Sequence, residues 1–128
     1  MIRKATSADI PGILALITLY PDKLLPRTAE DYQELIHLTW VVEHDGLIAG
    51  CASLEVYSPK IAEIRSVAVH PDYKGRGYGA ELISAAVAEA RKQNIHEIMV
   101  VTSSPEYFRS LGFGACLNEK FALFLGGK

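Results

Sequence analysis

Apolar residues follow two different spacings along the chain, and the changes of spacing divide it into predicted helices and strands. The longest helical pattern covers about residues 77–93, where apolar positions recur every three or four residues. Shorter helical patterns follow the capping residues Thr6 or Ser7 and Thr28, and another covers about 105–111. Runs rich in β-branched and aromatic residues predict strands at 1–5, 39–43, 47–57, 61–69, 95–101, 113–117 and 121–125. The expected order is β α α β β β α β α β β.

Two junctions indicate how these elements connect. Asp45 and Gly46 separate two strand patterns, and an Asp-Gly step is a strong hairpin signal. The strand at 61–69, the long helix and the apolar strand at 95–101 form a βαβ unit, in which the two strands run parallel. We therefore expect an α/β (α+β) fold with a mixed sheet.

Composition narrows the classes of function. A chain of 128 residues, 49% hydrophobic and 22% charged, suits a single domain covering 1–128. A net charge of −2 and Lys/Arg runs no longer than two residues argue against a nucleic-acid partner. No apolar run approaches the ~20 residues of a membrane span, and polar sequence follows the first residues without a signal segment. We expect no membrane partner and a cytoplasmic location.

Cysteines and histidines give little support for metal or disulfide chemistry. Cys51 and Cys116 are isolated in apolar stretches, so they are expected to be buried free thiols in a reducing compartment. The four histidines lack the spacing of metal ligands. No metal is expected.

A glycine-rich turn between the strand at 61–69 and the long helix carries the most specific chemistry. Lys74 and Arg76 flank Gly75, and Gly77 and Gly79 follow at alternate positions. A helix N-terminus offers unpaired N–H groups and the positive end of a dipole, and glycines let an anion approach the backbone closely. The turn is therefore a candidate phosphate site.

Two other interpretations of this turn remain open. It could be an ordinary glycine-rich turn with solvated cations. Residues 75–80 also match the dinucleotide fingerprint G-x-G-x-x-G/A, but 70–74 separate them from the strand and a second nucleotide-binding half is lacking.

Residues 62–113 resemble the GNAT N-acetyltransferase superfamily. The acyl-CoA signature is represented by residues 74–79, with Lys74 where the family has Arg or Gln; Val69-His70-Pro71 and the Leu-Gly-Phe step at 111–113 match two further motifs. The resemblance implies a mixed sheet of about seven strands, splayed in the middle, with about four helices. It also implies acetyl-CoA as donor, coenzyme A as product and a small-molecule amine as acceptor.

The resemblance assigns cofactor contacts position by position. Backbone groups of Val67, Ala68 and Val69 would follow the pantetheine arm, and the Val69 amide would polarise the thioester carbonyl. The pyrophosphate would be held by Lys74, Gly75, Arg76, Gly77, Tyr78, Gly79 and Ala80.

The resemblance also suggests candidates for proton transfer. Glu63 lies six residues before Val69, where histone-acetyltransferase members carry a catalytic glutamate, and it shares a strand face with Arg65. The alternative is that both charges lie on a solvated face or pair across strands. Many members place an acidic Tyr where this chain has Phe108, and Tyr107 would face about 100° away around a helix. Tyr57 and Tyr78 are further substitutes for the acid.

Within the superfamily, residues 24–28, 40–43, 45–52 and 62–66 are most similar to the acetyltransferase domain of short bacterial N-acetylglutamate synthases. That resemblance implies that Arg27 binds a substrate carboxylate, with Arg65 at the same site; a solvated loop arginine is the alternative. A tight turn at 118–120 replaces a longer insertion of that group, so the acceptor is expected to be a small amino acid or related amine. A protein or peptide amine, a non-catalytic acyl-CoA-binding module and a homodimer remain open.

Overall fold

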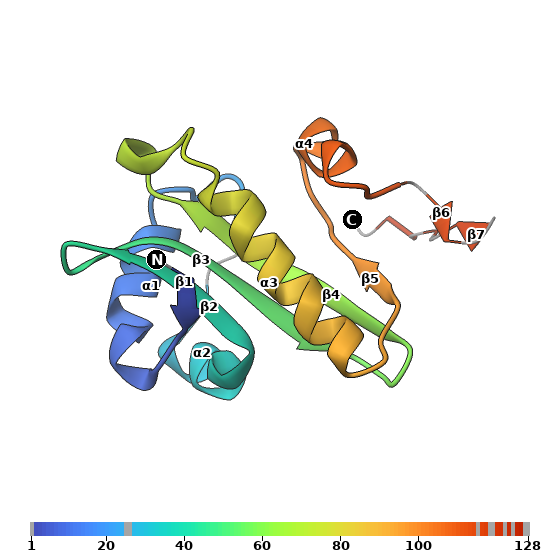
Figure 1. Ribbon diagram of the computed structural model, residues 1–128, viewed down its shortest axis with the longest axis horizontal. Helices are drawn as coiled ribbons and strands as arrows, with labels where there is room; N and C mark the ends of the chain where they lie inside the picture. Colours follow the sequence, from blue (N-terminus) through green and yellow to red (C-terminus); the bar gives the residue numbers. More distant parts are fainter. Residues whose placement is uncertain are drawn as a thin grey trace.

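A mixed sheet of five strands, in the order β1-β2-β3-β4-β5, runs through the middle of the protein (Figure 1). The computed structural model describes residues 2–24, 27–114, 116–117, 120–121, 123 and 125–126. Neighbouring strands are antiparallel except for the parallel pair β4–β5. The strands are β1 Ile2–Lys4, β2 Thr39–His44, β3 Leu47–Val56, β4 Ile61–Val69 and β5 Glu97–Met99. The predicted hairpin and the predicted βαβ unit are both confirmed.

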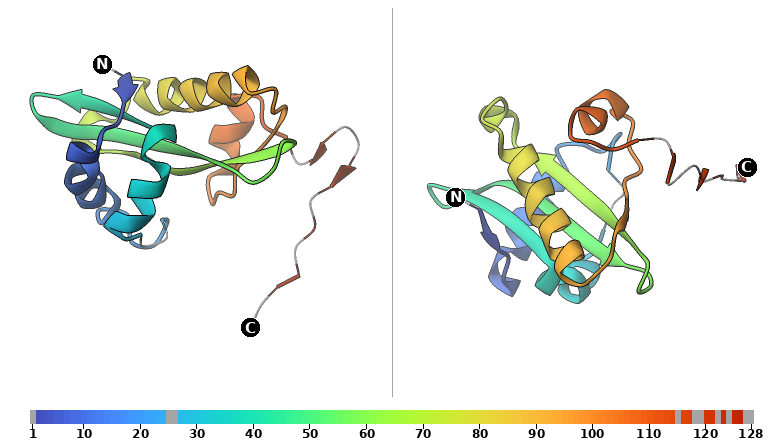
Figure 2. Two further views of the ribbon diagram at one scale, coloured as in Figure 1. Left: turned by 90° about the horizontal axis from the view of Figure 1, so that it is seen from below. Right: turned by 45° about the vertical axis from the view of Figure 1, so that its right-hand side comes forward.

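Helices cover both faces of this sheet. The 15-residue α3 (Tyr78–Lys92) lies on one face, whereas α1 (Ile10–Ile17) and α2 (Ala29–Leu35) lie on the other (Figure 2, left). The short α4 (Pro105–Ser110) follows β5. Short 3-10 turns occupy Ser7–Asp9, Ile36–Leu38 and Pro71–Tyr73. This three-layer arrangement buries one apolar stripe of each helix against the sheet.

The predicted helix ends follow from local side-chain chemistry. The Thr28 hydroxyl accepts a hydrogen bond from the Asp31 amide at 3.2 Å, and the Asp31 carboxylate accepts one from the Thr28 amide at 2.9 Å. This reciprocal capping satisfies donors that the first turn of a helix otherwise leaves unpaired. Asn94 ends α3 in the left-handed region at φ 62°, as expected for a residue just after a helix.

The centre of β4 contains an irregularity that shapes the site. Ser66 has φ 57°, and the register between β3 and β4 shifts beside it. An extra residue of this kind bends a strand and disrupts its pairing. The parallel partner β5 pairs with β4 only from Ile61 to Glu63. Within the described residues, the second half of β4 therefore diverges from the chain that follows β5.

The expectation of about seven strands in one sheet is wrong. β6 (Cys116–Leu117) and β7 (Lys120–Phe121) pair with each other in a separate two-stranded sheet (Figure 1). Two physical features account for this: β5 is three residues long, and Gly114 weakens the strand pattern that should have continued from Phe113. The predicted turn residues Asn118 and Glu119 lie outside the described part of the chain.

Candidate active site

A pocket of about 1000 Å³ lies between the second half of β4 and the chain that follows β5. Its wall also includes the glycine turn at 73–80, the first turn of α3 and the loop after α1. The divergence of β4 from β5 opens this space, because paired strands would lie about 4.8 Å apart and leave no room for a ligand. Backbone irregularity in β4 is therefore the structural cause of the pocket.

Glycine conformations shape the end of the pocket that adjoins α3. Gly75 and Gly77 have φ 81° and 83°, in the left-handed region that L side chains rarely adopt. A Cβ atom on either residue would meet nothing within 4 Å, so both border open space. Gly77 caps α3, whose first amides adjoin this space. The space and its donors fit a pyrophosphate.

The two cations of the turn behave differently. Lys74 lines the pocket, and its Nζ lies 5.1 Å from the centre of the Tyr20 ring. Arg76 stacks on Tyr73 instead, with Cζ 4.8 Å from the ring centre. The turn therefore presents Lys74 directly, whereas Arg76 lies beside the pocket rather than in its wall.

Tyr20 is a contact that the sequence did not predict. Its hydroxyl donates to the Val69 carbonyl at 2.5 Å, joining the loop after α1 to the end of β4. The pocket is also lined by the residues to which the resemblance assigns further cofactor contacts: Val67, Ala68, Val69, Tyr78, Gly79 and Ala80.

Charged groups gather where β3 and β4 border the other end of the pocket. The Tyr57 hydroxyl donates to Glu63 Oε1 at 2.5 Å. Arg65 Nη1 donates to Glu55 Oε1 at 2.9 Å, and Arg65 Nε lies 3.9 Å from Glu63 Oε1. Partial burial and the adjacent Glu63 carboxylate raise the pKa of Tyr57 to about 12, so the phenol stays protonated and keeps donating. The structure thus brings Glu63 and Arg65 together in an ion-paired cluster.

Arg27 reaches the same cluster from the loop before α2. Its side chain is only 12% exposed, and Nη2 lies 3.9 Å from Glu55 Oε1. Within the described residues this long ion pair is its one charged contact, and no side-chain hydrogen bond from Arg27 is formed. A largely covered guanidinium with unused donors is suited to a carboxylate ligand.

Tyr107, one of the candidates for the acid, lines the pocket from α4. Phe108 lines the pocket as well, but it is only 7% exposed and packs in the core. A Cβ atom placed on Gly79 would lie 2.6 Å from the Tyr107 hydroxyl oxygen, so this phenol faces the first turn of α3. Burial raises the pKa of Tyr107. Helix α4 has only six residues and lies beside the pocket, so the successive residues Tyr107 and Phe108 both reach the pocket wall.

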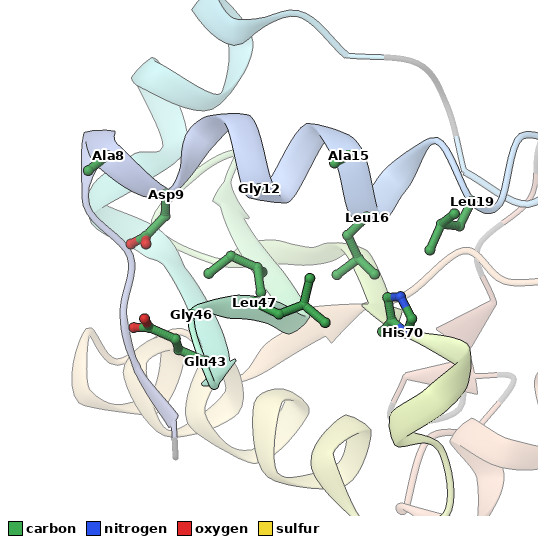
Figure 3. Close-up of a pocket in the computed structure, with 11 residues that line it drawn as sticks. Ala8, Asp9, Gly12, Ala15, Leu16, Leu19, Glu43, Gly46, Leu47 and His70 are labelled. Carbon is green, nitrogen blue, oxygen red and sulfur yellow. The ribbon is translucent and has the colours of Figure 1, made fainter.

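A smaller pocket of about 480 Å³ lies between α1 and the β2–β3 hairpin (Figure 3). Asp9 and Glu43 border it, but Arg3 binds both carboxylates, at 2.8 Å and 2.7 Å. In the part of the chain that the structure describes, no three His, Cys, Asp or Glu side chains gather as metal ligands would. That same part contains no helix with the length and apolarity needed to cross a membrane.

Comparison with known proteins places the fold and site in one class. Residues 12–113 match the acetyltransferase (GNAT) family, and the chain belongs to that family. An amino-acid acetyltransferase of Mycobacterium tuberculosis is 32% identical over 117 residues, covering 88% of this chain and 67% of the relative. One of Actinobacillus pleuropneumoniae serotype 5b is 37% identical over 116 residues, covering 88% of this chain. The chain spans only 26% of that longer relative.

Solved structures agree with this assignment. A Mycobacterium tuberculosis protein in complex with CoA has a TM-score of 0.86 at 30% identity, covering 91% of this chain and 73% of that one. N-acetylglutamate synthase from Neisseria gonorrhoeae, complexed with coenzyme A and N-acetyl-glutamate, has a TM-score of 0.82 at 34% identity. That match covers 88% of this chain and 27% of the synthase.

Proposed function

We propose that this protein transfers an acetyl group from acetyl-CoA to the amine of a small, carboxylate-bearing, amino-acid-like substrate. The observation that carries the proposal is that one pocket joins the glycine turn at α3 to the cluster of Glu63, Arg65 and Arg27. The relatives named amino-acid acetyltransferase, and the synthase that binds coenzyme A and N-acetyl-glutamate, support the same reaction.

The end of the pocket at α3 would hold the donor. Gly75 and Gly77 leave open space beside the first amides of α3, and Lys74 adds a positive charge. The backbone of Val67 and Val69 lines the route from this turn to the charge cluster. When bound there, acetyl-CoA supplies an acetyl thioester, whose carbonyl carbon accepts the amine nitrogen as the C–S bond breaks.

Glu63 is the proposed base. The amine must lose a proton to attack, and the carboxylate of Glu63 lies in the pocket wall, with its side chain 12% exposed. Tyr57 holds one of its oxygens through the 2.5 Å hydrogen bond. This fixes the carboxylate in place, so Tyr57 acts as a positioning residue rather than as an acid.

Tyr107 is the proposed proton donor to the departing sulfur. Its hydroxyl lies close to Gly79, at the junction of the cofactor turn and the route along β4. The raised pKa keeps the phenol protonated at neutral pH, as a general acid requires. Phe108, which occupies the position of the usual tyrosine, contributes packing instead.

Arg27 is the proposed anchor for the substrate carboxylate. Its planar group can grip a carboxylate through two parallel hydrogen bonds, which fixes the direction of the neighbouring amine. Glu63 and Arg27 border the same pocket, so an α-amino acid could present its amine to one while its carboxylate binds the other.

The experiment is thiol release from acetyl-CoA with a panel of L-amino acids and matched amines lacking the carboxylate. Glu63→Gln should lower turnover by roughly 10²–10⁴-fold with little change in acetyl-CoA affinity, and the deficit should shrink at high pH as the amine deprotonates unaided. Glu43→Gln, on a carboxylate paired with Arg3 outside this pocket, is the matched control. A deficit of equal size at all pH values would give Glu63 a positional role.

Two further functions are separated by the same assay. Acetylation of a protein or peptide amine would appear as thiol release with peptides and none with free amino acids. A binding module that has lost catalysis would bind acetyl-CoA and release no thiol with any acceptor.

A further inference from the structure

Glu55 occupies a position in the charge cluster that the reaction itself does not require. It lies on β3 directly opposite Glu63 on β4. Like charges at opposed positions destabilise a sheet unless something separates them. Arg65 lies between the two carboxylates, 2.9 Å from Glu55 and 3.9 Å from Glu63. Glu55 also lies 3.9 Å from Arg27. One carboxylate is therefore shared by both arginines of the site.

The acceptor end of the pocket is balanced in charge before any substrate binds. Arg27 and Arg65 face Glu55 and Glu63, so the cluster contains two cations and two anions. Asp22 and Lys23, which also line the pocket, again contribute one charge of each sign. Lys74 lies at the opposite end, in the glycine turn.

We propose that Glu55 is a specificity-determining residue that limits the acceptor to a single carboxylate, so that amino acids with uncharged side chains are preferred over dicarboxylates. This inference rests on the proposed function. A single α-carboxylate can bind Arg27, whose side chain donates no hydrogen bond within the described residues, and Arg65 keeps its partner. A second carboxylate at Arg65 would have to share that guanidinium with Glu55.

That sharing is unfavourable for two reasons. Glu55 and the substrate would compete for the charge-assisted hydrogen bonds of one guanidinium, which are among the stronger contacts in a partly buried site. Glu55 would also face a new anion at close range while Glu63 remains directly across the sheet. Removing the charge of Glu55 should therefore free Arg65 for a second carboxylate and relax the preference.

The experiment compares kcat/KM for L-glutamine and L-glutamate, which have nearly the same shape and differ by one charge. Wild type should prefer glutamine by ~10-fold or more, and Glu55→Gln should reduce that preference by ~10-fold, mainly by improving glutamate. Glu43→Gln, which removes a carboxylate paired with Arg3 at the other pocket, should leave the preference unchanged. Acetyl-CoA affinity of each variant reports whether its fold and donor site are intact.

The outcomes distinguish this inference from the proposed function. If wild type prefers glutamate, or if Glu55→Gln leaves the ratio unchanged, Glu55 does not set specificity, although amino-acid acetylation stands. If Glu55→Gln does not fold, the wild-type preference alone decides. If neither amino acid, nor any other in the panel, accelerates thiol release, the proposed function fails and this inference fails with it.

Discussion

Replacing Gly77 with alanine tests whether the glycine turn serves a ligand rather than the fold alone. Gly77 has φ 83°, and a Cβ atom there would meet no other atom within 4 Å. The methyl group would therefore cause no clash within the described structure. It would still impose backbone strain, and it would project into the space proposed for the pyrophosphate.

Gly46 provides a matched control with the same backbone problem. It has φ 79° in the β2–β3 turn, and a Cβ atom there would likewise meet nothing within 4 Å. Placing a side chain in the left-handed region costs roughly 1–2 kcal/mol. Both variants should therefore lose similar stability, a shift in melting temperature on the order of 5 °C for a domain of this size.

Only Gly77→Ala should change ligand binding. Loss of one hydrogen bond to a charged phosphate costs roughly 1.5–3 kcal/mol, or about 10- to 150-fold in affinity. Calorimetry with acetyl-CoA measures this directly, and thermal stabilisation by the same ligand provides a second readout. Equal affinity in both variants and wild type would refute the assignment of the turn, and so would an equal loss in both.

Two further predictions concern Tyr107 and the ion pair of Asp9 with Arg3. Tyr107→Phe removes the proposed proton donor, so kcat should fall by roughly 10²-fold with acetyl-CoA affinity retained; an unchanged kcat would exclude the role. Hydrogen bonds from Arg3 lower the pKa of Asp9 from 3.8 to about 2. A lowered folded-state pKa stabilises the protein above the unfolded value and loses that effect as pH falls through the folded value. Asp9→Asn should therefore cost roughly 1–2 kcal/mol at pH 7, allowing for partial exposure of Arg3, and progressively less between pH 4 and pH 2. Denaturant unfolding measures this, and a cost independent of pH would contradict it.

Signals confined to a few neighbouring residues predicted the fold well. The capping pattern at Thr28 and the hairpin step at Asp45 and Gly46 both lie where the sequence placed them. These features depend on hydrogen bonds and backbone preferences within one or two turns of chain, so a single sequence contains the necessary information. The glycine turn belongs to the same group.

Features that depend on distant pairing were not predicted. The positive φ of Ser66 lies in a run that reads as an ordinary strand, and the bond from Tyr20 to Val69 joins residues 49 positions apart. The position of Tyr107 depends on how a short helix packs beside the pocket, which helical spacing alone does not determine. Pairing of β6 with β7, instead of with the larger sheet, likewise depends on competition between distant strand edges.

The measurement that tests the central claim most directly is substrate discrimination by Arg27→Lys. This change keeps the charge but removes the planar, two-point grip on a carboxylate. Specificity for an L-amino acid should fall by roughly 10- to 150-fold, while a matched amine without the carboxylate should be a poor substrate for wild type and nearly unaffected by the change. Arg109→Lys, on a side chain that is 54% exposed on α4, should alter neither rate. If both substrates lose activity equally, or if the carboxylate-free amine is the better wild-type substrate, the claim that this pocket acetylates amino acids is contradicted.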